Sequence, residues 1–175
     1  IVLFVNGIPL CIIECKRPDI KDSLNQAISQ HLRNQKDDGI RSLYVYSALL
    51  LSTNVNEVSY ATTGTPKKFW NRWTDQFVDK TAEELYRYKL SEKVNQKHVV
   101  SDISWKEYRM CAEPTVQYGS LKTPSIQDSY LYNLCRPDRL LNLMYRFTLY
   151  DDGVKKIARY QQYFAVEKVM ERVRN

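Results

Sequence analysis

Residues 1–16, IVLFVNGIPLCIIECK, predict a β-hairpin whose second strand ends with an acid and a base. Two apolar runs are separated by Asn6-Gly7, and an Asn-Gly pair between such runs is the strongest short signal for a hairpin. Residues two apart in a strand share a face, so Glu14 and Lys16 should project together. Cys11, Ile13 and Cys15 should then project from the opposite face. A carboxylate and an ammonium at this place indicate either a functional site or a simple ion pair.

The register of this hairpin depends on its loop. A three-residue or bulged loop with Gly7 in the left-handed conformation pairs residues whose numbers sum to fourteen, and a residue before Ile1 would then face Glu14. A strict two-residue turn would instead pair that position with Ile13 and place it on the other face of the sheet.

Composition favours a globular domain with an acidic partner. The chain has 175 residues, of which 26% are charged and 43% hydrophobic, as is usual for globular proteins. A net charge of +6 and an isoelectric point near 9.1 favour a partner such as nucleic acid. No apolar run approaches eighteen residues, so no membrane span is expected. The opening run lacks the basic leader of a signal peptide and is broken by Asn6-Gly7.

The cysteines and histidines argue against zinc chemistry. Cysteines at positions 11, 15, 111 and 135 have no metal-like spacing, which predicts free thiols in a reducing cytoplasm. Only His31 and His98 could add imidazole ligands. Any metal would therefore be a hard ion held by oxygen atoms.

A helix and further strands should complete the sheet. Arg17-Pro18 ends the hairpin, and Asp19 or Asp22 can cap a helix that continues to about Gln35. On this helix Gln26 and Gln30 share a stripe, which is either functional or simply solvated. Residues 42–52, SLYVYSALLLS, predict one buried strand or two short strands interrupted at Ser47-Ala48, in the middle of the sheet. Residues 57–61 predict an edge strand.

Residues 62–75, TTGTPKKFWNRWTD, interleave cations with aromatic rings. Lys67, Lys68 and Arg72 would suit a nucleic-acid groove, where cations meet phosphates and rings stack. The alternative, slightly preferred, is a helix whose aromatic face covers the sheet. Residues 81–89 predict a short helix with Thr81 as N-cap and Glu84 at the capping-box position.

The second half of the chain predicts a connection followed by helices. Residues 91–129 are polar and aperiodic, with one short helix expected near residues 105–110. Arg136-Pro137-Asp138 should open a helix that runs through Phe147. A second helix is expected from Val154 to about Arg174, after a break at residues 151–153. Its apolar face should dock onto further protein.

Four segments together resemble the restriction (motor) subunit of type I restriction-modification enzymes. They are IVLFVNGIPLCIIECKRP, SQHLRNQ, GTPKKFWNRW and RPDRLLNLMYRFTLYDDGVKKIARYQQYFAVEKVM. In that family an N-terminal PD-(D/E)xK nuclease domain precedes two helicase-like ATPase domains. The resemblance implies an α/β fold, in which a mixed sheet flanked by helices forms a restriction-endonuclease-like core. It implies this core at residues 1–90, N-terminally truncated, a connection at residues 91–129, and a helical lead-in to the motor domain at residues 130–175.

The same resemblance implies a catalytic site around the hairpin. Glu14 and Lys16 match the family's Glu-x-Lys, and Gln26 matches the glutamine of a Q-x-x-x-Y helix. Gln30 occupies the tyrosine position, with His31 as the alternative. Glu14 and the backbone carbonyl of Cys15 would bind Mg²⁺. The family's aspartate would precede Ile1, and for that reason we expect the bulged loop.

The resemblance also implies that ATP is bound by downstream domains. Residues 1–175 contain no G-x-x-x-x-G-K-[ST] motif, so this chain should not be an ATPase by itself. By the resemblance, Arg159 and Gln162 lie at the adenine edge of that nucleotide site. The implied partners are double-stranded DNA and the specificity and methyltransferase subunits of the complex, in the cytoplasm of a bacterium or archaeon. This chain alone should be inactive.

The expected function is therefore a metal-dependent endonuclease domain that hydrolyses DNA phosphodiester bonds in an ATP-driven translocating complex. One alternative is a non-catalytic DNA-binding or docking module, in which Glu14 and Lys16 only pair. The other is a stand-alone nuclease of the same superfamily, such as a junction resolvase. The helices expected after Tyr130 argue against it, since a compact resolvase needs no such extension.

Overall fold

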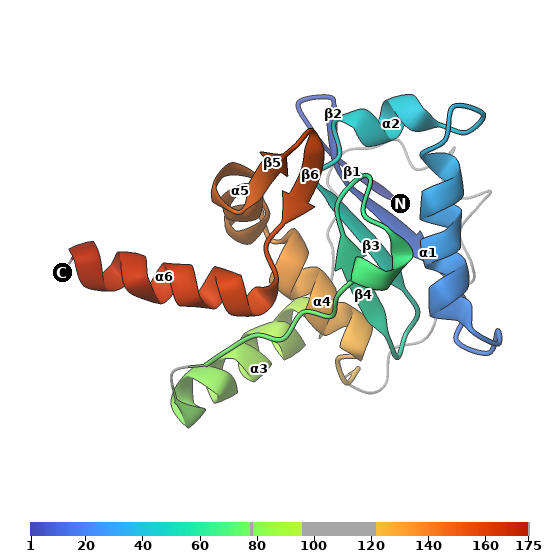
Figure 1. Cartoon of the computed structure of the whole chain (residues 1–175). Coiled ribbons are helices and arrows are strands. Elements are labelled where there is room, and N and C mark those ends of the chain that lie inside the picture. Colours follow the sequence, from blue (N-terminus) through green and yellow to red (C-terminus); the bar gives the residue numbers. More distant parts are fainter. Residues whose placement is uncertain (78, 96–121, 175) are drawn as a thin grey trace.

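A mixed four-stranded sheet with helices on both faces forms the centre of the molecule (Figure 1). The computed structural model describes residues 1–77, 79–95 and 122–174. The strands lie in the order β1 (Val2–Val5), β2 (Ile8–Cys15), β3 (Leu49–Thr53) and β4 (Val58–Ala61). The central pair β2 and β3 is parallel, and both outer pairs are antiparallel. The expected α/β class with a mixed, helix-flanked sheet is confirmed.

The β1–β2 hairpin combines a two-residue turn with a bulge. Asn6 and Gly7 have φ angles of 49° and 78°, and two positive values are what a tight hairpin turn of this length requires. Beyond the turn Leu10 is an extra residue, so the pairing changes from Phe4↔Pro9 to Leu3↔Cys11. The register expected for this hairpin is thus confirmed, but the bulge lies in the strand and not in the loop.

The connection from β2 to β3 carries two helices, α1 (Ser23–Asn34) and α2 (Arg41–Val45). A parallel strand pair needs such a crossover. The prediction of a strand over all of residues 42–52 was wrong in its first half, because residues 41–45 are helical and only Leu49–Thr53 forms the strand. A short apolar run does not distinguish a buried helix from a strand. Asp22 occupies the N-cap position of α1, and Gln35 follows its last residue.

The segment after β4 is extended, and the helix predicted for residues 62–75 was wrong. A single 3₁₀ turn, η1 (Lys67–Phe69), follows Pro66. The chain then returns along the free edge of β4, where Asn71 and Tyr60 exchange two backbone hydrogen bonds of 2.7 and 3.0 Å. This strap, residues 70–75, therefore covers one edge of the sheet, and its two tryptophans pack into different cores.

The remaining elements are α3 (Lys80–Asn95), α4 (Ile126–Cys135), α5 (Pro137–Arg146), β5 (Thr148–Asp151), β6 (Val154–Ile157) and α6 (Tyr160–Arg174). The helices predicted at residues 81–89 and from Pro137 are confirmed. The backbone N–H of Ala82 donates to Asp79, so Asp79 and not Thr81 caps α3. The helix expected from Val154 begins at Tyr160, because a hairpin turn at Asp152-Gly153 pairs β5 with β6.

Much of the region predicted as a connection, residues 96–121, lies outside the described residues, including the helix expected near residues 105–110. On either side of that gap, residues 91–95 form the last turn of α3 and residues 126–129 form the first turn of α4. Ser125 and Asp128 form a capping box at the start of α4. The proposed division of the chain into three segments stays a prediction.

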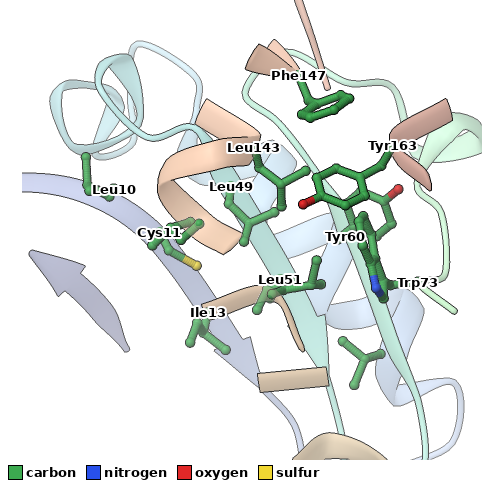
Figure 2. Close-up of a cluster of buried hydrophobic side chains, with 13 residues drawn as sticks. Leu10, Cys11, Ile13, Leu49, Leu51, Tyr60, Trp73, Leu143, Phe147 and Tyr163 are labelled. Atoms are coloured by element: carbon green, nitrogen blue, oxygen red, sulfur yellow. The ribbon is translucent and has the colours of Figure 1, made fainter. Parts of the chain in front are cut away.

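One face of the sheet packs against the C-terminal helices. Cys11, Ile13, Leu49, Leu51 and Tyr60 are buried against α4, α5 and the start of α6 (Figure 2). The helices contribute Leu134, Leu140, Leu143 and Tyr163 to this core, and Phe147, which directly follows α5, completes it. Residues from both ends of the sequence therefore share one core.

A buried ion pair connects the C-terminal helices to the strap, residues 70–75. The Arg139 guanidinium of α5 lies 3.2 Å from Asp75, and both side chains are less than 10% exposed. Asp75 also accepts a hydrogen bond of 3.0 Å from the Trp73 indole. The guanidinium lies over the Tyr163 ring, 4.7 Å from its centroid. Arg139 thus joins α5, α6 and the strap through charge, hydrogen bonding and cation–π contact.

The other face of the sheet contains a buried histidine. His31 of α1 is 1% exposed and packs on Trp70, with the ring centroids 5.4 Å apart. Its Nε2 donates to the Leu51 carbonyl, and its Nδ1 accepts from the Tyr44 hydroxyl, both at 3.0 Å. A carbonyl only accepts, so Nε2 carries a proton, and burial favours the neutral ring, in which Nδ1 is the acceptor. Burial lowers the pKa of His31, and the hydrogen bond to Leu51 partly opposes that effect.

We predict that Arg139→Ala lowers the free energy of unfolding by about 3 to 5 kcal/mol, because Asp75 is left buried without its partner. The control is Arg146→Ala on the same helix, where the arginine is exposed and the change should stay within about 0.5 kcal/mol. Urea titration of both variants measures the difference. Equal effects would contradict the role given to the buried pair.

We also predict a pH dependence of stability from His31. Its pKa is lower in the folded than in the unfolded chain, so the stability it contributes is fully present above the unfolded pKa of about 6.5 and is lost as pH falls below that value through the folded pKa. The free energy of unfolding should therefore decrease between about pH 7 and about pH 5.5. His31→Gln keeps an N–H donor but does not titrate, so its free energy of unfolding should change less steeply with pH than that of the wild type. Equal slopes would refute the assignment.

Candidate active site at the end of strand β2

Glu14 and Lys16 lie together where β2 leaves the sheet. The Glu14 carboxylate and the Lys16 ammonium are 2.9 Å apart, and their side chains are 22% and 23% exposed. The backbone N–H of Lys16 donates to the Thr53 carbonyl at 2.8 Å, which extends the β2–β3 ladder past Cys15. Glu14 shares the face of Ile12, which packs with Tyr44 and Leu50 on the α1 side. The shared face expected of Glu14 and Lys16 is confirmed.

Gln30, and not Gln26, touches Lys16. The Lys16 ammonium donates to Gln30 Oε1 at 2.5 Å, while Gln26 donates to the backbone carbonyl of Lys21 at 2.9 Å. Gln26 remains on the same stripe of α1, one turn earlier, and its catalytic role stays a prediction. His31 points into the core. Of the two candidates for the tyrosine position, Gln30 is therefore the one at the site.

A groove of about 310 Å³ opens beside this contact. It is lined by Lys16, Asp22, Asn25, Gln26, Ser29, Gln30, Arg33 and Lys67. Among the cations expected to bind DNA, Lys67 joins the groove from η1. Lys68 lies outside the groove, over the Phe69 ring at 4.8 Å from its centroid, and Arg72 pairs with Glu57 at 3.0 Å. The DNA-binding roles of these two residues stay predictions. The groove thus combines the expected Lys67 with Arg33, which the sequence reasoning did not single out.

The hairpin register determines what can stand opposite Glu14. Ile1 and Ile13 exchange two hydrogen bonds of 2.8 Å, so they form a directly opposed pair. A residue placed before Ile1 on β1 would oppose Glu14 and share its face. From the other side β3 presents Ser52 to Glu14. The Ser52 hydroxyl is buried and has no hydrogen-bond partner.

These groups fit a hard cation only in part. No cluster of three or more histidine, cysteine or acidic side chains that could hold a metal occurs in the described part of the chain. Glu14 supplies one carboxylate, and the unpartnered Ser52 hydroxyl lies on the adjacent strand in register with it. Mg²⁺ commonly takes one or two carboxylates and keeps several waters. The site therefore suits Mg²⁺ if a second acid stands opposite Glu14. The Cys15 thiol faces away and contacts Gln127 at 3.9 Å.

Arg159 and Gln162 lie apart from this site, at the start of α6. The Arg159 backbone N–H donates to Gln162 Oε1 at 2.9 Å, and both residues are exposed. Helix α6 packs its first turns on the sheet face opposite α1 (Figure 1). Gln162 acts here as a cap of the helix. Its nucleotide-binding role and that of Arg159 stay predictions.

Sequence reasoning missed Ser52 and Arg33 for different reasons. Arg33 follows Gln26 and Gln30 at helical spacing, so the same stripe already contained that signal. Ser52 could not be found this way, because its place beside Glu14 depends on the pairing of two strands separated by two helices.

Comparisons with known proteins agree with the resemblance found in the sequence. Residues 1–69 match the family described as the N terminus of the type I restriction enzyme R protein. A protein of Methanocaldococcus jannaschii, named as the endonuclease subunit of type I restriction enzyme MjaIXP, is 28% identical over 172 residues. That alignment covers 98% of this chain and 14% of the relative. No solved structure gives a significant match.

The matched family segment contains every residue of the groove and of the Glu14–Lys16 pair. Within the described ranges, no helix is long and apolar enough to cross a membrane. The resemblance to the restriction subunit of type I enzymes is therefore confirmed, and it rests on the family match over residues 1–69 and on the similarity to the archaeal endonuclease subunit.

Proposed function

We propose that this chain is a PD-(D/E)xK endonuclease domain, restriction-endonuclease-like in its core, which cleaves DNA with Mg²⁺ as part of a type I restriction enzyme. The observation that supports this most strongly is the arrangement of Glu14, Lys16 and Gln30 beside an open polar groove. A structural ion pair alone would not need the third partner or the groove. The family match over residues 1–69 supports the same proposal.

The proposed metal site uses Glu14, the Cys15 backbone carbonyl and an acid placed before Ile1. When bound, Mg²⁺ would lower the pKa of a coordinated water and offset charge on the phosphate. Glu14 is held for this role by Lys16 and by its position at the end of a central strand. The free Ser52 hydroxyl would receive or donate a hydrogen bond within the same site.

Lys16 is proposed to act directly on the reacting phosphate or the attacking water. Its ammonium has three N–H donors, and the structure uses two of them, toward Glu14 and Gln30. The third is available for an oxygen on which negative charge develops. Gln30 is a positioning residue in this proposal, because it orients the lysine and does not itself contact the reacting atoms.

The rest of the enzyme is proposed to lie outside this chain, which spans 14% of the length of its relative. Downstream helicase-like domains would bind ATP, with Arg159 and Gln162 near the adenine. Double-stranded DNA would be the substrate. Specificity and methyltransferase subunits would complete the complex in the cytoplasm.

We predict that Lys16→Ala in the whole protein, with its partner subunits, abolishes DNA cleavage, with a fall in rate of at least about 10²- to 10³-fold. ATP hydrolysis stimulated by DNA should stay near wild type, because the two reactions occupy different domains. Both activities and the melting temperature are measured on one preparation.

The control is Lys89→Ala, which removes an exposed cation of α3 outside the groove and should leave both activities unchanged. If Lys16 only pairs with Glu14, its loss should lower stability by about 1 to 3 kcal/mol, and both activities would decline together. Normal cleavage by a well-folded Lys16→Ala enzyme would remove this residue from the mechanism.

A further inference from the structure

We infer that Arg33 and Lys67 form a phosphate clamp, which holds the backbone of duplex DNA in the groove next to Lys16. This inference rests on the proposed nuclease function and adds to it the residues that hold the substrate strand. It is carried by the shape of the groove, its unbalanced charges and the chemistry of its lining.

The groove follows one face of α1 over three turns. Its lining residues on this helix recur at helical spacing from Asp22 to Arg33, a distance of about 16 Å at 1.5 Å per residue. Phosphates of one strand in B-form DNA are about 3.4 Å apart along the duplex axis. Because a strand winds around that axis, its phosphates are farther apart than this rise, and the groove is long enough to contact successive phosphates of one strand. Lys67 lines it from the separate element η1.

Arg33 and Lys67 differ from Lys16, the third cation of the groove, in that they lack an acidic partner. Arg33 and Lys67 are both exposed and form no ion pair within the described residues. By contrast, six other arginines pair with a carboxylate: Arg17, Arg41, Arg72, Arg87, Arg136 and Arg139. Cations left unpaired in a hollow next to a candidate nuclease site are available to bind phosphate.

Charge is distributed unevenly along the groove. Asp22 is its single acidic lining residue and lies at the N-terminal end of α1, where it accepts a 2.5 Å hydrogen bond from Asn25. Arg33 lies at the opposite end, in the last turn of the helix. Lys16 contacts Gln30 between these ends. A polyanion should therefore bind to the half of the groove that contains Lys16 and Arg33.

The lining favours backbone contacts over base contacts. Besides the charged groups it consists of amides and one hydroxyl, and it includes no aromatic ring. Single-stranded bases bind by stacking on aromatic side chains, which this groove does not offer. Cations and amides suit phosphate oxygens instead. The groove should thus bind duplex DNA without regard to sequence.

The test is fluorescence anisotropy of a labelled DNA duplex with the 175-residue chain, without divalent metal, over a series of salt concentrations. Arg33→Gln combined with Lys67→Gln should weaken binding about tenfold and reduce the slope of log K against log salt by about 1.8, since each phosphate contact contributes about 0.9. The control is Arg146→Gln combined with Arg172→Gln, which removes the same charge from exposed sites outside the groove. It should change the slope little.

Three outcomes would overturn the inference. They are unchanged binding by the groove variant, equal weakening by the control, and full displacement of the duplex by millimolar inorganic phosphate at constant ionic strength, which would indicate a site for free phosphate. Melting temperatures of all variants exclude unfolding as the cause.

The DNA cleavage activity of the Lys16→Ala variant, measured in the whole protein, tests the proposed function independently of this inference. Weaker binding by the groove variant together with normal cleavage by Lys16→Ala would support the clamp and contradict the catalytic assignment. Unchanged DNA binding by the groove variant together with lost cleavage by the Lys16→Ala enzyme would contradict the clamp and support the catalytic assignment.

Discussion

The register of the β1–β2 hairpin is the constraint on which the candidate site depends. Because successive side chains of a strand alternate between faces, a slip of one residue moves every side chain to the other face. The extra residue Leu10 shifts the pairing so that Ile1 opposes Ile13. Without that bulge the position before Ile1 would oppose Ile13 and point toward the C-terminal helices. With it, that position and Glu14 face α1 together.

The two faces of the sheet differ in how they are covered. On one face, the Arg139–Asp75 pair and the aromatic side chains around it hold α5, α6 and the strap against an apolar core (Figure 2). The other face is covered by α1 only in part, and His31 anchors this helix through hydrogen bonds at both ring nitrogens. Beyond the end of β2 the exposed stripe of α1 therefore remains open as a groove. The apolar core that stabilises the fold thus lies on one face of the sheet, and the polar groove on the other face stays accessible to solvent.

Local sequence signals predicted the parts of this fold that depend on local interactions. The hairpin, the face shared by Glu14 and Lys16, the edge strand β4 and the start of α5 at Pro137 all follow from turn chemistry or periodicity. The errors arose where long-range packing overrides local preference. The apolar run that includes Tyr44 becomes α2, whose Tyr44 packs against Ile12 and Leu50 of the sheet. Residues 70–75 become a strap because the edge of β4 accepts backbone hydrogen bonds. The contact of Gln30 with Lys16 depends on how α1 lies on the sheet, which periodicity alone does not determine.

We propose that Glu14 and a residue before Ile1 form one metal site, and calorimetric titration with Mg²⁺ or Mn²⁺ measures this binding. Two extended chains are compared, one with a single aspartate added before Ile1 and one with an asparagine there. We expect saturable binding at one site by the aspartate chain. Asparagine in its place, or Glu14→Gln in the aspartate chain, should weaken that binding by at least about tenfold, because Mg²⁺ prefers carboxylate ligands. Equal binding by the aspartate and asparagine chains would contradict the account.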